Sequence, residues 1–239
     1  MIIIFRKSKL ILSFLFILLG VFGVNLLKNA GEAVIVSSVP NFGKRVVLDA
    51  GHGIPDGGAV AEDGTEEADI NLKITSFLQG FLEKGGSYVT LTRADENGIF
   101  DEDAKNIKQK KRSDIKNREK MMNGSEADVF ISIHLNKFPE NKYSGPQVFH
   151  SKNEESKLLA EKIQKRMIEF LNPDSKREIK PSGGEIYLLK NAKIPAVLVE
   201  CGFLSNPEEL SLLKDEEYQK QTAWAIYCGI CDYFAGGDT

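Results

Sequence analysis

The chain has 239 residues, and its 31 lysines and arginines against 34 aspartates and glutamates give a formal net charge of −3. This balance excludes a protein that holds a nucleic-acid backbone through a strongly basic face. With 42% hydrophobic and 27% charged residues, the composition excludes disordered, collagen-like and many-span membrane proteins. Three cysteines are too few and too clustered for a disulfide framework, so packing must stabilise the fold.

The first 33 residues differ in kind from the rest of the chain. Arg6, Lys7 and Lys9 precede an uncharged run over residues 10–27, which is the pattern of an export signal. This run lies at the lower limit of a membrane span, so a cleaved signal peptide and a retained membrane anchor are both open. Because positive charge stays on the inner side, either alternative predicts that residues 34–239 lie outside the cytoplasmic membrane.

Apolar strands and amphipathic helices alternate after this segment. The predicted strands cover residues 45–50, 88–92, 128–134, 148–150, 185–189 and 195–200. The predicted helices cover residues 67–84, a stretch around 115–122, and residues 154–170, 207–213 and 217–234. Residues 94–120 are polar, and their basic run 108–112 is interpreted as a solvated face.

This order of elements contains no internal repeat and no interdomain linker. It predicts a single α/β domain with a twisted, mostly parallel central sheet of about six strands and helices on both faces. The runs 128–134 and 195–200 are almost continuously apolar, as expected for central strands that are covered on both sides.

Polar residues stand where predicted buried strands end. His52 follows the first strand, and His134 and Glu200 end two later ones. In an open α/β sheet, ligands bind at the carboxyl edge of the strands. Glu67 opens the helix after the first strand, so its carboxylate can return over the same edge. Two imidazoles and one carboxylate are a ligand set for catalytic zinc, and a second carboxylate is then available as a general base.

Each of these residues also has a structural alternative. A histidine at a strand end is often only hydrogen-bonded, and His150, within a predicted strand, is assigned that role. Glu67 fits the first turn of a helix, where the helix dipole favours an acid. Glu200 fits a purely structural role least well, because a carboxylate between Val199 and Cys201 is costly to bury without a partner.

Cysteine chemistry is a competing hypothesis. Cys201 could act as a nucleophile with His134 as its base. Thiol enzymes usually place the cysteine at the start of a helix, whereas Cys201 follows a strand. Cys228 and Cys231 form a C-x-x-C pattern inside an apolar helix without a second cysteine pair. We therefore expect all three cysteines to serve packing.

Five sequence motifs stand in a distinctive order: VVLDAGHG at residues 46–53, EADINL at 67–72, LTR at 91–93, SIHLN at 132–136 and PAVLVECGFLSN at 195–206. Their order and spacing resemble the zinc-dependent N-acetylmuramoyl-L-alanine amidases, the amidase type 3 family, over about residues 44–234. The resemblance implies a zinc amidase catalytic domain over residues 34–239. It also implies one Zn²⁺ held by His52, Glu67 and His134, with Glu200 as the catalytic acid and base.

The implied reaction is hydrolysis of the amide that joins N-acetylmuramic acid to L-alanine of the peptidoglycan stem peptide. Glu200 would take a proton from a water activated by zinc and return it to the leaving amine. Asp49 and Asn136 are expected next to the ligands. Arg93 or Arg118 is expected to hold a stem-peptide carboxylate.

The single exported domain without wall-binding repeats looks most like the germination-specific spore-cortex amidases of the CwlD type. This implies a role in forming muramic-δ-lactam and a place at the cell wall or cortex. Ala68 stands where the family often has lysine beside the glutamate ligand. We also expect an accessory protein to control the enzyme, with residues 94–120 as its surface. The alternative from another class is a catalytically silent peptidoglycan-binding or regulatory domain on the same fold.

Overall fold

The computed structural model describes residue 15, residues 17–19 and residues 39–236. The predicted signal or anchor over residues 1–33 therefore lies, except for four residues, outside the described part of the chain. Within the described part, no helix is both long and apolar enough to cross a membrane.

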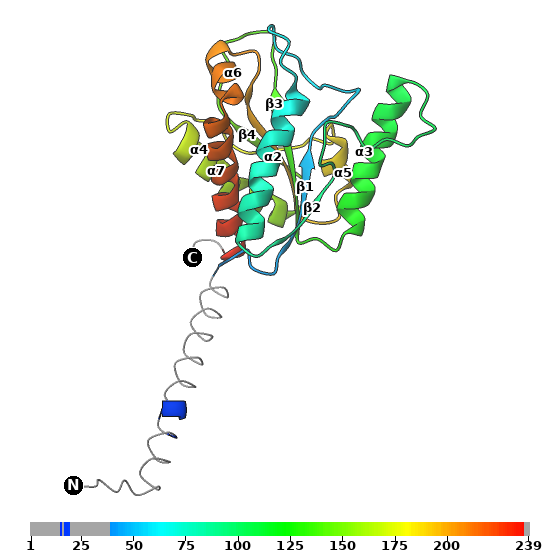
Figure 1. Ribbon diagram of the computed structural model, residues 1–239. Coiled ribbons are helices and arrows are strands. Elements are labelled where there is room, and N and C mark those ends of the chain that lie inside the picture. The colour runs from blue at the N-terminus through cyan, green and yellow to red at the C-terminus, as the bar shows by residue number, and fades with distance from the viewer. Residues whose placement is uncertain (1–14, 16, 20–38, 237–239) are drawn as a thin grey trace, which may run out of the picture.

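A six-stranded sheet forms the centre of the molecule (Figure 1). The strand order across it is β2-β1-β3-β6-β4-β5. Strand β1 runs parallel to β2 and β3, β3 runs parallel to β6, and β4 is antiparallel to β6 and parallel to β5. The predicted mostly parallel α/β fold is thus confirmed. The strands are β1 (Arg45–Ala50), β2 (Tyr88–Leu91), β3 (Val129–Asn136), β4 (Gln147–His150), β5 (Lys180–Pro181) and β6 (Ala196–Phe203).

Helices cover both faces of this sheet (Figure 1). One face carries α2 (Glu67–Lys84), α4 (Glu154–Leu171), α6 (Pro207–Lys214) and α7 (Glu216–Phe234). The other face carries α3 (Ile107–Gly124) and the short α5 (Tyr187–Asn191). Side-chain oxygens cap several helix starts, for example Asn153 at α4, which accepts from the amide of Ser156.

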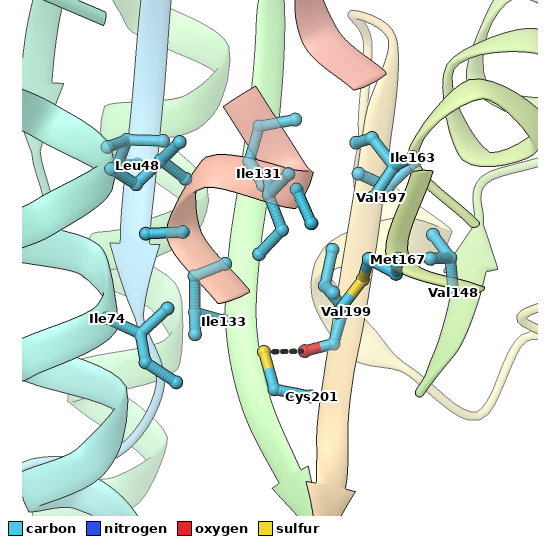
Figure 2. Packing of buried hydrophobic residues seen from close by; sticks show 14 of the residues in the cluster. Leu48, Ile74, Ile131, Ile133, Val148, Ile163, Met167, Val197, Val199 and Cys201 are labelled. Carbon is cyan, nitrogen blue, oxygen red and sulfur yellow. Dashed lines mark hydrogen bonds between the residues drawn. The ribbon is translucent and has the colours of Figure 1, made fainter. Parts of the chain in front are cut away.

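The core consists of two layers, one on each face of the sheet. Successive strand residues point to opposite faces. In β3, Ile131 and Ile133 join the cluster beneath α2, α4 and α7, whereas Phe130 joins the cluster beneath α3 and α5. Figure 2 shows part of the first cluster, with Ile74 of α2 and Ile163 of α4 among the packed side chains. Burial on both faces explains why the central strands read as continuous apolar runs.

The predicted strand over residues 185–189 is wrong. These residues lead into α5, where Leu188 and Leu189 are both buried against the second core cluster. Two adjacent buried leucines are compatible with one turn of helix packed on the sheet as well as with a strand, so the sequence pattern does not separate the two structures. The sixth strand is instead the two-residue β5, whose Lys180 and Pro181 are exposed and carry no apolar signal.

The central strands are longer than predicted. Strands β3 and β6 have eight residues each, so His134 and Glu200 lie inside the strands and not at their last residues. A shift in register follows between His134 and Asn136, where β3 parts from its regular pairing with β6. Both side chains still lie toward the carboxyl ends of their strands.

Candidate metal centre

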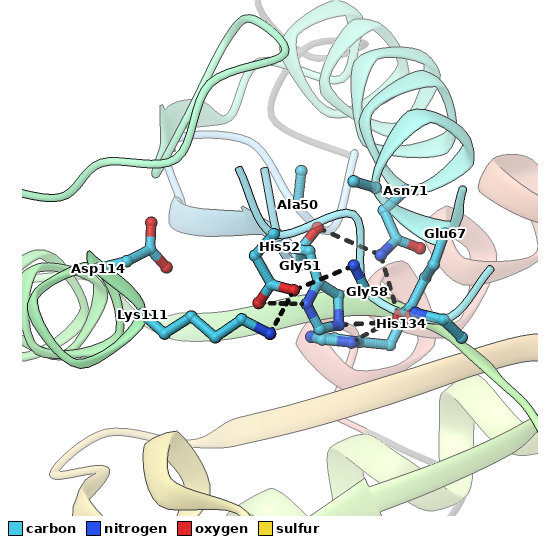
Figure 3. Close-up of polar contacts among 12 residues, drawn as sticks. Ala50, Gly51, His52, Gly58, Glu67, Asn71, Lys111, Asp114 and His134 are labelled. Atoms are coloured by element: carbon cyan, nitrogen blue, oxygen red, sulfur yellow. Dashed lines mark hydrogen bonds and ion pairs between the residues drawn. The ribbon is translucent and has the colours of Figure 1, made fainter. Parts of the chain in front are cut away.

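Three of the predicted site residues meet at the carboxyl edge of the sheet. His52 lies just after β1, Glu67 is the first residue of α2, and His134 belongs to β3. One ligand atom from each residue lies within 4.8 Å of the others. The two imidazole rings stand edge to face with 4.9 Å between their centroids (Figure 3). We call His52, Glu67 and His134 the metal-ligand cluster.

Glu67 is the buried centre of this cluster. Its Oε1 lies 2.9 Å from Nδ1 of His134 and accepts the backbone N–H of Leu135, while its Oε2 lies 3.3 Å from Nε2 of His52 and accepts the N–H of Ala59. Burial alone would raise the pKa of this carboxyl, but the hydrogen bonds from His134 and His52 hold the pKa well below its usual range. Glu67 is therefore an anion that both histidines face.

Asn71 also contacts Glu67 and was not predicted as a site residue. Its side-chain N–H donates to Oε1 of Glu67 at 3.2 Å and to the carbonyl of Gly51 at 3.3 Å. The two side chains are four residues apart on α2, so they lie on one helix face. That spacing is the sequence signal that identifies Asn71 as a contact of Glu67.

The loop after β1 holds His52 in an unusual backbone conformation and leaves little space around its side chain. His52 has a φ of 63°, in the left-handed region that non-glycine residues rarely adopt. A Cβ atom on Gly51 would overlap the His134 ring, and one on Gly58 would lie 2.6 Å from both His52 Cδ2 and Glu67 Oε2. Glycine at these two positions lets the backbone approach the cluster closely.

His52 has a second carboxylate partner. Its Nδ1 lies 3.1 Å from Oδ2 of Asp56, on the side of the ring away from Glu67. Burial alone would lower the pKa of His52, but the hydrogen bonds to Asp56 and Glu67 raise it to about 9. Asp56 was absent from the predicted site residues, because its contact with His52 depends on how the loop turns.

Glu200 lies beside the cluster but is not bonded to it. In the sheet it pairs with His134 across β3 and β6. Its Oε2 is buried and has no hydrogen-bond partner among the described residues. Burial raises the pKa of Glu200 to about 7, with the nearby imidazole of His134 acting in the opposite direction. A buried carboxylate oxygen without a partner is available to accept a proton.

Asp49 lies beneath the site, at the end of β1 and beside the cavity that His52 and His134 line. It is fully buried and accepts hydrogen bonds from Arg118 at 2.6 Å, Thr92 at 2.7 Å and Ser132 at 2.5 Å. Burial opposes ionisation, yet Arg118 and the two hydroxyls lower the pKa of Asp49 below its usual value. Asn136, at the end of β3, contributes its backbone carbonyl to the N–H of Leu204.

The two arginines do not have the geometry predicted for substrate contacts. Arg93 is 4% exposed and Arg118 is 2% exposed. Arg93 donates to the carbonyls of Ala50, Gly51, Ala68 and Asp95. Arg118 donates to Asp49, to Asp114 and to the carbonyls of Ala50 and His52. Both guanidinium groups are thus occupied by the protein itself, and the assignment to a stem-peptide carboxylate is corrected to bracing of the loop that carries His52.

Of the three cysteines, Cys201 has the surroundings expected for a packing residue, whereas Cys228 and Cys231 are only partly buried. Cys201 is fully buried in the first core cluster, and its thiol faces the carbonyl of Val199 (Figure 2). Burial and the charge of Glu200 raise the pKa of this thiol well above its usual value, which disfavours a thiolate nucleophile. Cys228 and Cys231 are free thiols on α7, and burial also raises their pKa values.

A cavity of about 110 Å³ opens beside the cluster. It lies between the sheet edge, α3 and α5, so a small group of a substrate can approach the two imidazoles from this side. Its lining includes His52, Asp56, Lys111, His134 and Leu188.

The chain is similar in sequence and in fold to known amidases. The family model described as N-acetylmuramoyl-L-alanine amidase matches residues 46–232. The chain is 39% identical over 198 residues to the germination-specific N-acetylmuramoyl-L-alanine amidase of Bacillus subtilis (strain 168), which covers 82% of each protein. Among solved structures, the CwlD amidase from Clostridioides difficile in complex with the GerS lipoprotein matches with a TM-score of 0.79 and 45% identity, over 81% of this chain and 99% of that one. An N-acetylmuramoyl-L-alanine amidase from Clostridium difficile 630 matches with a TM-score of 0.70 and 27% identity, over 82% and 99%.

Proposed function

The chain belongs to the N-acetylmuramoyl-L-alanine amidase family, and from this premise we propose that it is a zinc-dependent amidase whose metal is held by His52, Glu67 and His134. The substrate is peptidoglycan, and the bond broken is the amide between N-acetylmuramic acid and L-alanine of the stem peptide. The observation that carries the proposal is the metal-ligand cluster with the unpartnered, buried oxygen of Glu200 beside it.

The residues present fit a zinc ion. Two imidazoles and one carboxylate are a common set of protein ligands for catalytic zinc, which leaves a further position open. Gly51 and Gly58 keep the space around the rings free of side chains. When bound by such a set, zinc polarises a carbonyl oxygen and lowers the pKa of water toward neutrality.

Glu200 is the proposed general base and acid. Its pKa of about 7 is close to the pH at which proton transfer is most efficient. Its buried Oε2 accepts a proton from the attacking water and then donates it to the amine of L-alanine as the amide breaks. Glu67 does not serve this role in the proposal, because its carboxylate is assigned to the metal together with the two histidines.

We assign the enzyme to spore-cortex maturation, where removal of the peptide prepares muramic acid for conversion to the δ-lactam needed in germination. Support comes from the germination-specific relative in Bacillus subtilis and from the CwlD amidase of Clostridioides difficile. That amidase was solved with the GerS lipoprotein, so an accessory protein is the partner that we propose for this chain. The relatives also include probable cell wall amidases of staphylococci, which supports a place outside the cytoplasmic membrane. In this arrangement residues 1–33 direct export or anchor the protein and residues 34–239 catalyse.

The test combines metal analysis with digestion of peptidoglycan. The purified protein should contain one zinc per chain and should release stem peptides with a free L-alanine amine from cortex peptidoglycan, seen by mass spectrometry. Chelation of the metal should abolish the release, and added zinc should restore it. Stoichiometric zinc without any amide cleavage, even when an extract that supplies the proposed accessory protein is added, would favour a catalytically silent wall-binding domain instead.

A further inference from the structure

The two nitrogens of His52 face different carboxylates. Nε2 faces Oε2 of Glu67 within the metal-ligand cluster, at 3.3 Å, and Nδ1 faces Oδ2 of Asp56, at 3.1 Å. A carboxylate on Nδ1 keeps the ring proton at that nitrogen. When a metal binds in the cluster, Nε2 would lose its proton to solvent and offer its lone pair to the metal, while Nδ1 would keep its proton on the Asp56 side. Asp56 is therefore placed to fix both the tautomer and the orientation of one proposed ligand.

Asp56 is itself held in place from two directions. Its Oδ1 accepts the backbone N–H of Gly58 at 3.2 Å and lies 2.7 Å from Nζ of Lys111 on α3. Its backbone exchanges two hydrogen bonds of 2.9 Å with Gly53, which closes a tight loop after His52. Figure 3 shows Lys111 extending from α3 to this loop. The contact joins segments that lie 55 residues apart in the chain.

Asp56 is an anion in this arrangement. One of its oxygens lies 2.7 Å from the ammonium of Lys111, and the other lies 3.1 Å from Nδ1 of His52. An anionic partner strengthens the electron donation of an imidazole, and metal-bound histidines commonly donate their second N–H to a carboxylate. The side chain is only partly buried, so the ion pair with Lys111 stays modest in strength.

We propose that Asp56 is a positioning residue for the proposed zinc site: it fixes His52 so that Nε2 binds the metal, and Lys111 of α3 holds Asp56 in that position. The inference rests on the zinc amidase function proposed above. According to this inference, metal affinity also depends on Asp56, which does not touch the metal. It depends as well on α3, which lies on the face of the sheet opposite α2.

The experiment measures the zinc dissociation constant of the full chain by competition with a chromogenic chelator. Asp56→Ala removes the contacts of the carboxylate with His52, Gly58 and Lys111, and zinc affinity should fall about 10- to 100-fold, the range known for partners of metal-bound histidines. Asp56→Asn keeps the shape and an oxygen for the N–H of Gly58 but removes the charge, so its affinity should fall in the same direction by less. Asp63→Asn is the matched control, because Asp63 pairs with Lys214 away from the cluster.

The role of Lys111 is tested on neighbouring lysines of one helix. Lys111→Gln should weaken zinc binding about two- to fivefold, as expected for loss of a partly exposed ion pair. Lys110→Gln should leave zinc binding unchanged, because Lys110 lies over the ring of Phe100 instead. If Lys111→Gln raised KM for peptidoglycan fragments without changing zinc affinity, Lys111 would be a substrate contact, and its positioning role would be refuted.

Thermal unfolding of the metal-free variants separates positioning from general stability. Asp56→Asn should unfold within about 4 °C of the unsubstituted protein while it binds zinc more weakly, since loss of one partly exposed ion pair changes the unfolding temperature of a domain of this size only slightly. Unchanged zinc affinity in both Asp56 variants would overturn the inference while leaving the amidase proposal intact. A full chain that bound no zinc at all would overturn the proposed metal centre itself, so the two failures are distinguishable.

Discussion

Replacement of Glu200 by glutamine is the most direct test of the proposed chemistry. The side chain keeps its length and one acceptor oxygen but can no longer take up a proton. Positioned general acids and bases contribute about 10² to 10⁴ in rate, so turnover should fall by at least that range, which corresponds to about 3 to 5 kcal/mol of activation free energy. Zinc content should stay at one per chain, because the carboxylate makes no hydrogen bond to the metal-ligand cluster in the structure.

The same substitution should raise the stability of the folded chain, although it lowers turnover. The pKa of Glu200 rises from 4.5 to about 7 in the folded chain because of burial, so the charged form opposes folding. This opposition is absent below about pH 4, where the group is protonated in both states. It grows as pH rises from 4.5 to 7 and then stays constant, with an upper limit of about 3 kcal/mol. The metal-free Glu200→Gln variant should therefore be more stable than the unsubstituted protein at pH 8 and equally stable at pH 4.

The assays are zinc per chain, amide cleavage of cortex fragments and denaturant unfolding of the metal-free forms at the two pH values. Glu208→Gln is a suitable control, because Glu208 is exposed at the start of α6 and should change none of the three. Loss of zinc in Glu200→Gln would make the carboxylate a ligand and Glu67 the candidate base. Near-native turnover would leave neither role for Glu200.

Three further predictions concern the cluster, the core and the buried ion pair. His134→Ala should keep the fold but lose zinc retention, and stoichiometric zinc in that variant would refute its assignment as a ligand. Cys201→Ala should keep most activity, and the native protein should resist alkylation, since the thiol is buried with a raised pKa; total loss of activity with zinc intact would revive a cysteine mechanism. Arg118→Leu leaves Asp49 buried without its cation and should lower the free energy of unfolding by about 3 to 5 kcal/mol at pH 7. Because the pKa of Asp49 is lowered in the folded chain, its contribution to stability is present above about pH 4 and declines below it, so the difference between variant and native protein in denaturant unfolding should shrink in acid.

Strand order made much of the site predictable from the sequence. His52, His134 and Glu200 follow or end apolar runs, and the carboxyl ends of parallel strands meet at one edge. The prediction needed only the direction of the strands and not their exact length, so it tolerated the longer β3 and β6 of the structure. The short α5 was missed for a physical reason, because five residues contain too little periodicity to separate a helical turn from a strand.

Contacts that depend on loop conformation were not predictable. The pairing of Asp56 with Lys111 requires both the turn after His52 and the tilt of α3, neither of which the sequence pattern determines. The basic run 108–112 was interpreted as a solvated face, and Lys111 is indeed half-exposed, yet its ammonium group reaches the loop. The two arginines illustrate the opposite error: sequence shows their charge but not the carbonyl groups that occupy them.

Those carbonyl groups explain why buried arginines accompany this site. The chain leaves β1 at Ala50 and adopts a left-handed conformation at His52, so the carbonyls at this turn lack the regular partners that a continuing strand would supply. Arg93 and Arg118 both bond the carbonyl of Ala50, and they also reach those of Gly51 and His52 respectively. Asp49 balances the charge of Arg118 within the core. The buried charges therefore follow from placing a proposed metal ligand on a strained turn, and the stability of the domain and the geometry of the metal centre depend on the same hydrogen bonds.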